Sequence, residues 1–166
     1  MVKGANYWIE QLELAPHPEG GHFRETYRSN EKIPREALPE RYEGDRNFST
    51  CVYFLLQDKD HSRLHKLQSD ELWHFYHGSP VTLYIITPEG DLETKTLGPR
   101  PDKGHGFQAV IKKFSWFGAI VREEGGYSLV GCNVAPGFDF TDFEIGDKEE
   151  LKKHFPAQKA IIEQLG

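Results

Sequence analysis

The chain has 166 residues, of which 28% are charged and 37% hydrophobic, as is typical of one soluble globular domain. Its net charge is -6, and an acidic protein repels nucleic acid, so we expect no nucleic-acid partner. No apolar run is long enough to cross a bilayer, so we expect no membrane partner. Cys51 and Cys132 lie in apolar runs and indicate no disulfide framework. Because the N-terminus also lacks the apolar run of a secretion signal, we expect a cytoplasmic location.

The two ends of the chain have the pattern of short helices. Tyr7 and Leu12 belong to an apolar set at helical spacing, which predicts a helix over about residues 5–14. The same spacing predicts a helix over about residues 147–165, and Pro156 must break or kink it because proline lacks the backbone N–H group.

The chain between these helices, about residues 20–145, has the pattern of strands separated by turns. The clearest strands are His22–Arg28, Asn47–Gln57, Pro80–Pro88, Asp91–Leu97, Phe107–Lys112, Ser115–Arg122 and Tyr127–Val134. In the first of them, strict alternation puts Glu25 on one face and both Arg24 and Arg28 on the other, as in an exposed edge or a pocket wall. The polar segment 31–46 reads as a loop, which suits a lid or a subunit contact. About nine strands with helices only at the ends predict an all-β sandwich or barrel in a single domain, residues 1–166.

One stretch, Ser62 to Gly78, concentrates the titratable side chains. It holds His65, Glu71 and His74 and lies between two apolar, strand-like runs. This setting predicts a small-molecule pocket built on rigid strands rather than a solvated loop. Alternation from Glu71 puts Trp73 on the same side as Glu71 and His74 on the opposite side, unless a bulge intervenes.

This stretch resembles the first motif of the cupin superfamily. Glu71 and Gly78 have the spacing of the end of that motif, and His65 matches its first histidine, while Leu67 stands where the second histidine belongs. With His17–Gly21, Tyr27–Ser29 and Val134–Phe138, the stretch is similar to the "cupin 5" family over about residues 6–145. The resemblance implies a double-stranded β-helix, the cupin jelly-roll barrel, with terminal helices packed outside, a pocket in the barrel mouth and a homodimeric assembly.

The resemblance leaves the metal content open. Its second motif falls on Lys112–Phe117, where Trp116 is kept but Phe117 stands at the metal-binding histidine position. The usual set of ligands is then reduced to His65 and Glu71, with His74 as a further ligand only if its side chain turns inward. Such nitrogen and oxygen ligands suit a divalent transition metal, so a metal-dependent enzyme is one hypothesis and a pocket without any cofactor is the other.

The residues also suit acid–base chemistry without a metal. A carboxylate beside an imidazole fixes the tautomer of the ring and raises its basicity, so His65 could take a proton from carbon and Tyr53 could return one. Residues 19–25 are loosely similar to a strand of dTDP-sugar epimerases, in which case Arg24 or Arg28 would contact phosphate or carboxylate. The interpretation is isomerase-like or epimerase-like chemistry on a carbohydrate-like or keto-acid ligand. A non-catalytic module that binds or senses a small ligand is the alternative.

These arguments name a set of candidate site residues. The catalytic candidates are His65, Glu71, His74 and Tyr53, and the ligand-binding candidates are Arg24, Arg28, Ser62, Lys66, Trp73 and Trp116.

Overall fold

The computed structural model describes residues 3–166, so the first two residues of the predicted domain lie outside the described part. The strands are β1 (Ala15–Pro16), β2 (His22–Arg28), β3 (Lys32–Ile33), β4 (Arg46–Asn47), β5 (Thr50–Gln57), β6 (His61–Leu67), β7 (Glu71–Gly78), β8 (Val81–Ile86), β9 (Leu92–Leu97), β10 (Gln108–Ile111), β11 (Trp116–Val121), β12 (Tyr127–Val134) and β13 (Phe143–Ile145). The helices are α1 (Ala5–Gln11), α2 (Lys148–His154) and α3 (Lys159–Leu165).

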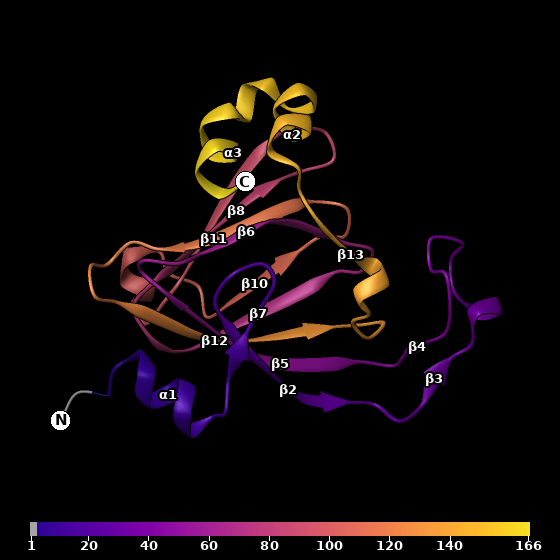
Figure 1. The fold of residues 1–166 in the computed structure, drawn as a ribbon, viewed down its shortest axis with the longest axis horizontal. Coiled ribbons are helices and arrows are strands. Elements are labelled where there is room, and N and C mark those ends of the chain that lie inside the picture. The colour runs from indigo at the N-terminus through magenta and orange to yellow at the C-terminus, as the bar shows by residue number, and fades with distance from the viewer. Residues whose placement is uncertain (1–2) are drawn as a thin grey trace.

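Two antiparallel sheets face each other across the core (Figure 1). One sheet has the order β1-β2-β5-β12-β7-β10 and the other β13-β6-β11-β8-β9, while β3 and β4 form a separate pair. Most neighbours in each sheet come from distant parts of the chain, as in a jelly roll. The predicted all-β jelly roll with helices outside it is therefore confirmed.

The helices cover the outer faces of the sheets, and their ends follow from local chemistry. The first helix ends at Gln11, earlier than predicted, because Glu13 takes a positive φ of 52° that turns the chain toward β1. The Trp8 indole N–H of α1 donates to the Tyr127 hydroxyl oxygen over 2.7 Å. The C-terminal helix is broken at Pro156 as predicted, into α2 and α3. None of the helices in residues 3–166 has the length and hydropathy needed to cross a membrane.

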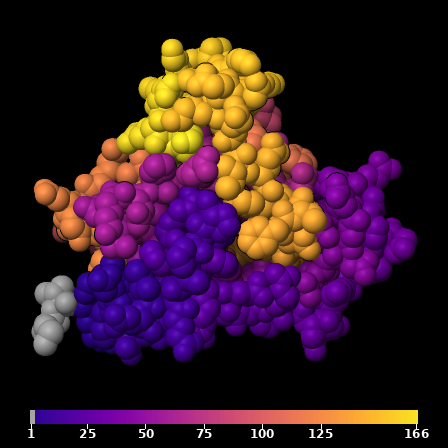
Figure 2. Space-filling view, in the orientation of Figure 1, coloured from indigo at the N-terminus to yellow at the C-terminus, as the bar shows by residue number. Residues whose placement is uncertain are grey.

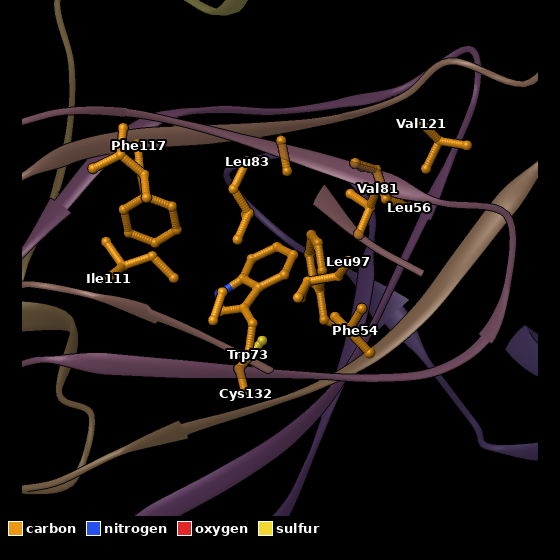
Figure 3. Close-up of a cluster of buried hydrophobic side chains, with 14 residues drawn as sticks. Phe54, Leu56, Trp73, Val81, Leu83, Leu97, Ile111, Phe117, Val121 and Cys132 are labelled. Carbon is orange, nitrogen blue, oxygen red and sulfur yellow. The ribbon is translucent and has the colours of Figure 1, made fainter. Parts of the chain in front are cut away.

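A dense apolar core fills the space between the two sheets. Trp73 lies at its centre with Leu83 and Leu97 nearby, and Phe117 and Ile111 lie on one side of the indole (Figure 3). Only 1% of Trp73 is exposed to solvent. Three members of this core, Phe54, Trp73 and Cys132, also line a cavity, so the core forms the floor of that cavity.

The polar segment expected to be a loop forms a projecting arm, residues 32–47, built on β3 and β4 (Figure 1). Its base is joined to residues 138–143, which we call the mouth segment. The guanidinium group of Arg46 donates to both carboxylate oxygens of Asp142, over 2.7 and 2.6 Å, and the two side chains are 4% and 6% exposed. A buried, doubly hydrogen-bonded ion pair therefore links the arm to the mouth segment.

Candidate functional site

A cavity of about 310 Å³ lies between the two sheets, beside the mouth segment. Its lining is His17, Glu19, Phe23, Glu25, Arg28, Thr50, Val52, Phe54, His65, Leu67, Glu71, Trp73, Cys132, Val134, Phe138, Asp139, Phe140 and Phe143. Figure 2 shows the N-terminal part of the chain and the mouth segment in contact at the surface, so segments distant in sequence meet on this side. The cavity combines aromatic walls with a group of buried, titratable side chains.

One of these groups, Glu19, lies in the loop between β1 and β2. Gly20 has a φ of +109°, and a Cβ atom there would collide with the carbonyl oxygen of His61. The loop can therefore lie directly on β6, where the Arg63 N–H donates to the Glu19 carbonyl oxygen over 2.7 Å. This contact and the glycine conformation hold the Glu19 side chain inside the cavity.

Glu19 and His65 lie within hydrogen-bond distance of each other. The Nδ1 atom of His65 lies 2.7 Å from the carbonyl oxygen of Arg63, which can only accept, so Nδ1 carries a hydrogen. The Nε2 atom lies 3.1 Å from Oε2 of Glu19, whose Oε1 accepts from the Ser62 hydroxyl over 2.8 Å. Burial raises the pKa of Glu19 to about 8 and lowers the pKa of His65. Both shifts favour a protonated Glu19 that donates to a neutral His65.

Glu71 lies at the start of β7 beside this pair. Its Oε1 accepts from the Trp73 indole N–H over 3.1 Å. Burial raises the pKa of Glu71 to about 7, and the hydrogen bond from Trp73 opposes this rise. Near neutral pH, Glu71 can therefore both release and accept a proton.

The structure brings some of the predicted site residues together and separates others. His65, Glu71, Arg28 and Trp73 line the cavity, and Ser62 reaches it through Glu19. The remaining candidates, His74, Tyr53, Arg24, Lys66 and Trp116, are not part of its lining.

Strand alternation explains why these candidates lie elsewhere. Tyr53 stands between two lining residues of β5 and packs against Tyr76, with ring centroids 6.0 Å apart. His74 has the outward orientation that alternation predicts, and its Nδ1 lies 3.0 Å from the Gln108 amide. The bulge between β7 and β12 comes only after His74, between Leu129 and Val130 of β12.

The other three candidates make contacts of their own. Arg24 forms an ion pair with Glu13 over 3.0 Å. Lys66 lies over the ring of Trp116 and pairs with Glu144 over 2.9 Å, in a separate cavity of about 380 Å³ near α2.

Arg28 lies on the cavity side, which corrects the face assigned by strict alternation. A bulge between Glu25 and Tyr27 shifts the register of β2 against β5, so Arg28 and Glu25 share a face. The guanidinium donates to both Glu25 carboxylate oxygens over 2.9 and 2.8 Å, and also to Asn47 Oδ1 and the Phe138 carbonyl oxygen. The positive charge of Arg28 is therefore already neutralised by a protein carboxylate.

Sequence reasoning gave no role to two residues of the site, His17 and Glu19. Both lie in a loop, where strand periodicity carries no information about orientation. The available signal was the Gly20–Gly21 pair directly after Glu19, since adjacent glycines with positive φ indicate a close approach of the backbone to a neighbouring strand.

The residues around His65 do not fit the metal hypothesis. Phe117 pairs in register with His65, and the two ring centroids lie 4.1 Å apart, so an apolar ring occupies the place of a ligand. Both ring nitrogens of His65 have partners within the protein. Across residues 3–166 no group of three or more His, Cys, Asp or Glu side chains is arranged to hold a metal ion. We therefore derive no step through a metal.

A jelly roll of two facing sheets, with a cavity lined by residues from both, defines a protein of the cupin type. The family model Cupin_5, described as "Cupin superfamily (DUF985)", matches residues 6–146, and the chain belongs to this family. The chain is 28% identical to the uncharacterized protein YML079W of Saccharomyces cerevisiae over 93% of its own length and 81% of that protein.

Solved structures agree with the family assignment. Protein SO0799 of Shewanella oneidensis superposes with a TM-score of 0.88 and 38% identity, covering 99% of this chain and 98% of that one. A hypothetical protein of Leishmania major gives 0.88 and 34%, with 98% of each chain covered. Oxalate decarboxylase of Bacillus subtilis gives 0.56 and 16%, covering 91% of this chain and 36% of that one, which shows a shared fold alone.

Proposed function

We propose that the cavity catalyses isomerase-like or epimerase-like acid–base chemistry, without a metal, on an uncharged carbohydrate-like ligand. The observation that carries the proposal is the buried Glu71 carboxyl group in the cavity wall, with a pKa of about 7, beside the Glu19–His65 pair. A base works best when its pKa lies near the working pH.

Glu71 is the group that we assign as the base. Its carboxylate would take a proton from the carbon next to a carbonyl group, leaving an enediolate, and return the proton to the adjacent carbon. The proton of the neighbouring hydroxyl group would move to the former carbonyl oxygen, so that atoms and charge balance. His65 is a positioning residue in this scheme because both of its nitrogens bond within the protein.

The charges of the cavity favour a neutral ligand over a keto acid. Four lining residues carry carboxyl groups, namely Glu19, Glu25, Glu71 and Asp139, and the one lining arginine, Arg28, is paired with Glu25. An anionic ligand would meet no unpaired cation there. The phenylalanines of the mouth segment offer ring faces to a sugar, and about 310 Å³ is at the small end of ligand sites, as a monosaccharide requires.

A binding module without chemistry is the second candidate. Its support is that His65 and Glu71 both have hydrogen-bond partners within the protein, as a preformed wall for a bound ligand would.

One experiment separates the two candidates. The protein would be incubated in D₂O with a panel of aldoses and ketoses, and the loss of carbon-bound hydrogen would be followed by ¹H NMR. We expect exchange with at least one sugar, abolished in Glu71→Gln, whose amide keeps the shape and an oxygen acceptor for Trp73. His74→Gln, a change on the outer face, is the control and should leave exchange unchanged. Thermal stabilisation by a sugar without exchange would identify a binding module, and exchange that survives Glu71→Gln would refute the assignment of the base.

Homodimer formation and a cytoplasmic location both stay predictions.

A further inference from the structure

His17 belongs to the cavity wall but has no part in the scheme above. Its ring packs edge-on against Phe23, with centroids 4.5 Å apart, and lies nearly parallel to the Phe140 ring of the mouth segment. Its Nδ1 accepts a hydrogen bond from the Glu19 backbone N–H over 3.1 Å. Because a backbone N–H can only donate, Nδ1 carries no proton, and a neutral His17 ring must carry its proton on Nε2.

The charge state of His17 agrees with this tautomer. Burial lowers the pKa of His17 to about 4. The imidazole is therefore neutral at physiological pH, and the hydrogen bond to Nδ1 selects which neutral form is present.

The Nε2–H group of His17 is a donor without a partner among the described residues. No hydrogen bond joins it to any group of residues 3–166, although the side chain is only 10% exposed. The fully buried side-chain polar atoms that lack a partner in this part of the chain are His22 Nδ1 and Ser128 Oγ, so His17 Nε2 is not sealed inside the protein. Since the ring lines the cavity, the opening available to this donor is the cavity itself.

We propose that His17 donates its Nε2–H to the carbonyl oxygen of the substrate and stabilises the oxyanion that forms when Glu71 removes the carbon-bound proton. The inference rests on the proposed function and adds a substrate-contacting residue to it. A neutral imidazole suits this role because it gives a directed hydrogen bond, and the aromatic rings packed around it hold the ring in place.

Two substitutions separate this role from a purely structural one. His17→Gln places an amide N–H₂ near the position of Nε2 but gives up the acceptor for the Glu19 N–H. His17→Asn keeps an acceptor near the position of Nδ1 but loses the donor toward the cavity. We expect exchange in D₂O to fall by about 10² to 10³-fold in His17→Asn, as for loss of one oxyanion donor, and to be largely kept in His17→Gln. A role limited to holding the loop would give the opposite order.

The tautomer can be measured without any substrate. In protein labelled with ¹⁵N-histidine, long-range ¹H–¹⁵N spectra should show His17 protonated on Nε2 alone from pH 5 to pH 8. An Nδ1–H form, or a charged ring in that range, would overturn the proposal. Exchange that depends on Glu71 but is unchanged in His17→Asn would overturn the role of His17 alone. An absence of exchange with every sugar of the panel in the unaltered protein would overturn the proposed function, and this inference with it.

Discussion

Replacement of Glu71 by glutamine should make the protein more stable at alkaline pH. The fold raises the pKa of Glu71 from 4.5 to about 7, so the folded state holds a proton that the unfolded chain has already released. Stability from this group is complete below pH 4.5, is lost as the pH rises through about 7, and stays lost above it. A difference of about 2.5 pKa units at about 1.4 kcal/mol per unit corresponds to about 3–4 kcal/mol. Glutamine has no proton to release, so the stability of Glu71→Gln does not fall in this way as the pH rises.

The assay is urea denaturation of the unaltered protein and Glu71→Gln at pH 4 and pH 8. We expect the stability of the variant relative to the unaltered protein to rise by about 3–4 kcal/mol between these two pH values. Glu93→Gln, which changes an exposed carboxylate on β9, serves as the control and should show almost no such change. A difference that does not vary with pH would mean that Glu71 is ionised in the folded protein well below pH 7, and the argument for Glu71 as a base would fail.

Three further changes test other parts of the structure. Arg46→Met should lower the free energy of unfolding by about 3–5 kcal/mol because Asp142 would be left buried without its partner, and the double variant Arg46→Met/Asp142→Leu should regain most of this in urea denaturation. A single variant as stable as the unaltered protein would show that the pair is not desolvated. Gly20→Ala should lower the melting temperature and slow exchange, since its Cβ would push the loop off β6; wild-type values in both assays would contradict the described loop. Phe117→His would place a second imidazole beside His65 and should increase Ni²⁺ affinity in titration calorimetry, whereas unchanged affinity would show that the ring does not occupy a ligand position.

The fold was predictable because it depends on periodicity that runs along whole strands. Alternation in β7 placed Glu71 and Trp73 inside and His74 outside, and the structure has this arrangement. Alternation failed for Arg28 because a single bulge, which leaves no clear mark in the sequence, changes the face of every later residue in the strand. The position of Glu19 depends on a loop whose path is fixed by contacts with β6, so strand periodicity could not reveal it, and the Gly20–Gly21 pair indicated only that the loop backbone approaches a neighbouring strand.

The same reasoning explains the candidates that lie outside the cavity. Lys66 and Trp116 are each next in sequence to a residue that points into the barrel, His65 and Phe117, and adjacent strand residues point to opposite faces. A motif alignment identifies the strands that carry site residues, but strand pairing and register decide which side of the sheet each side chain takes.

The buried ion pair between Arg46 and Asp142 bears on how the proposed ligand would enter and leave the cavity. The mouth segment carries Phe138 and Phe140 in the cavity lining, and its Asp142 is held from the base of the arm. Any widening of the mouth must therefore break this bond or carry the arm along with it. For the proposed ligand, we therefore expect the rate of release to depend on the motion of the projecting arm rather than on the rotation of one side chain.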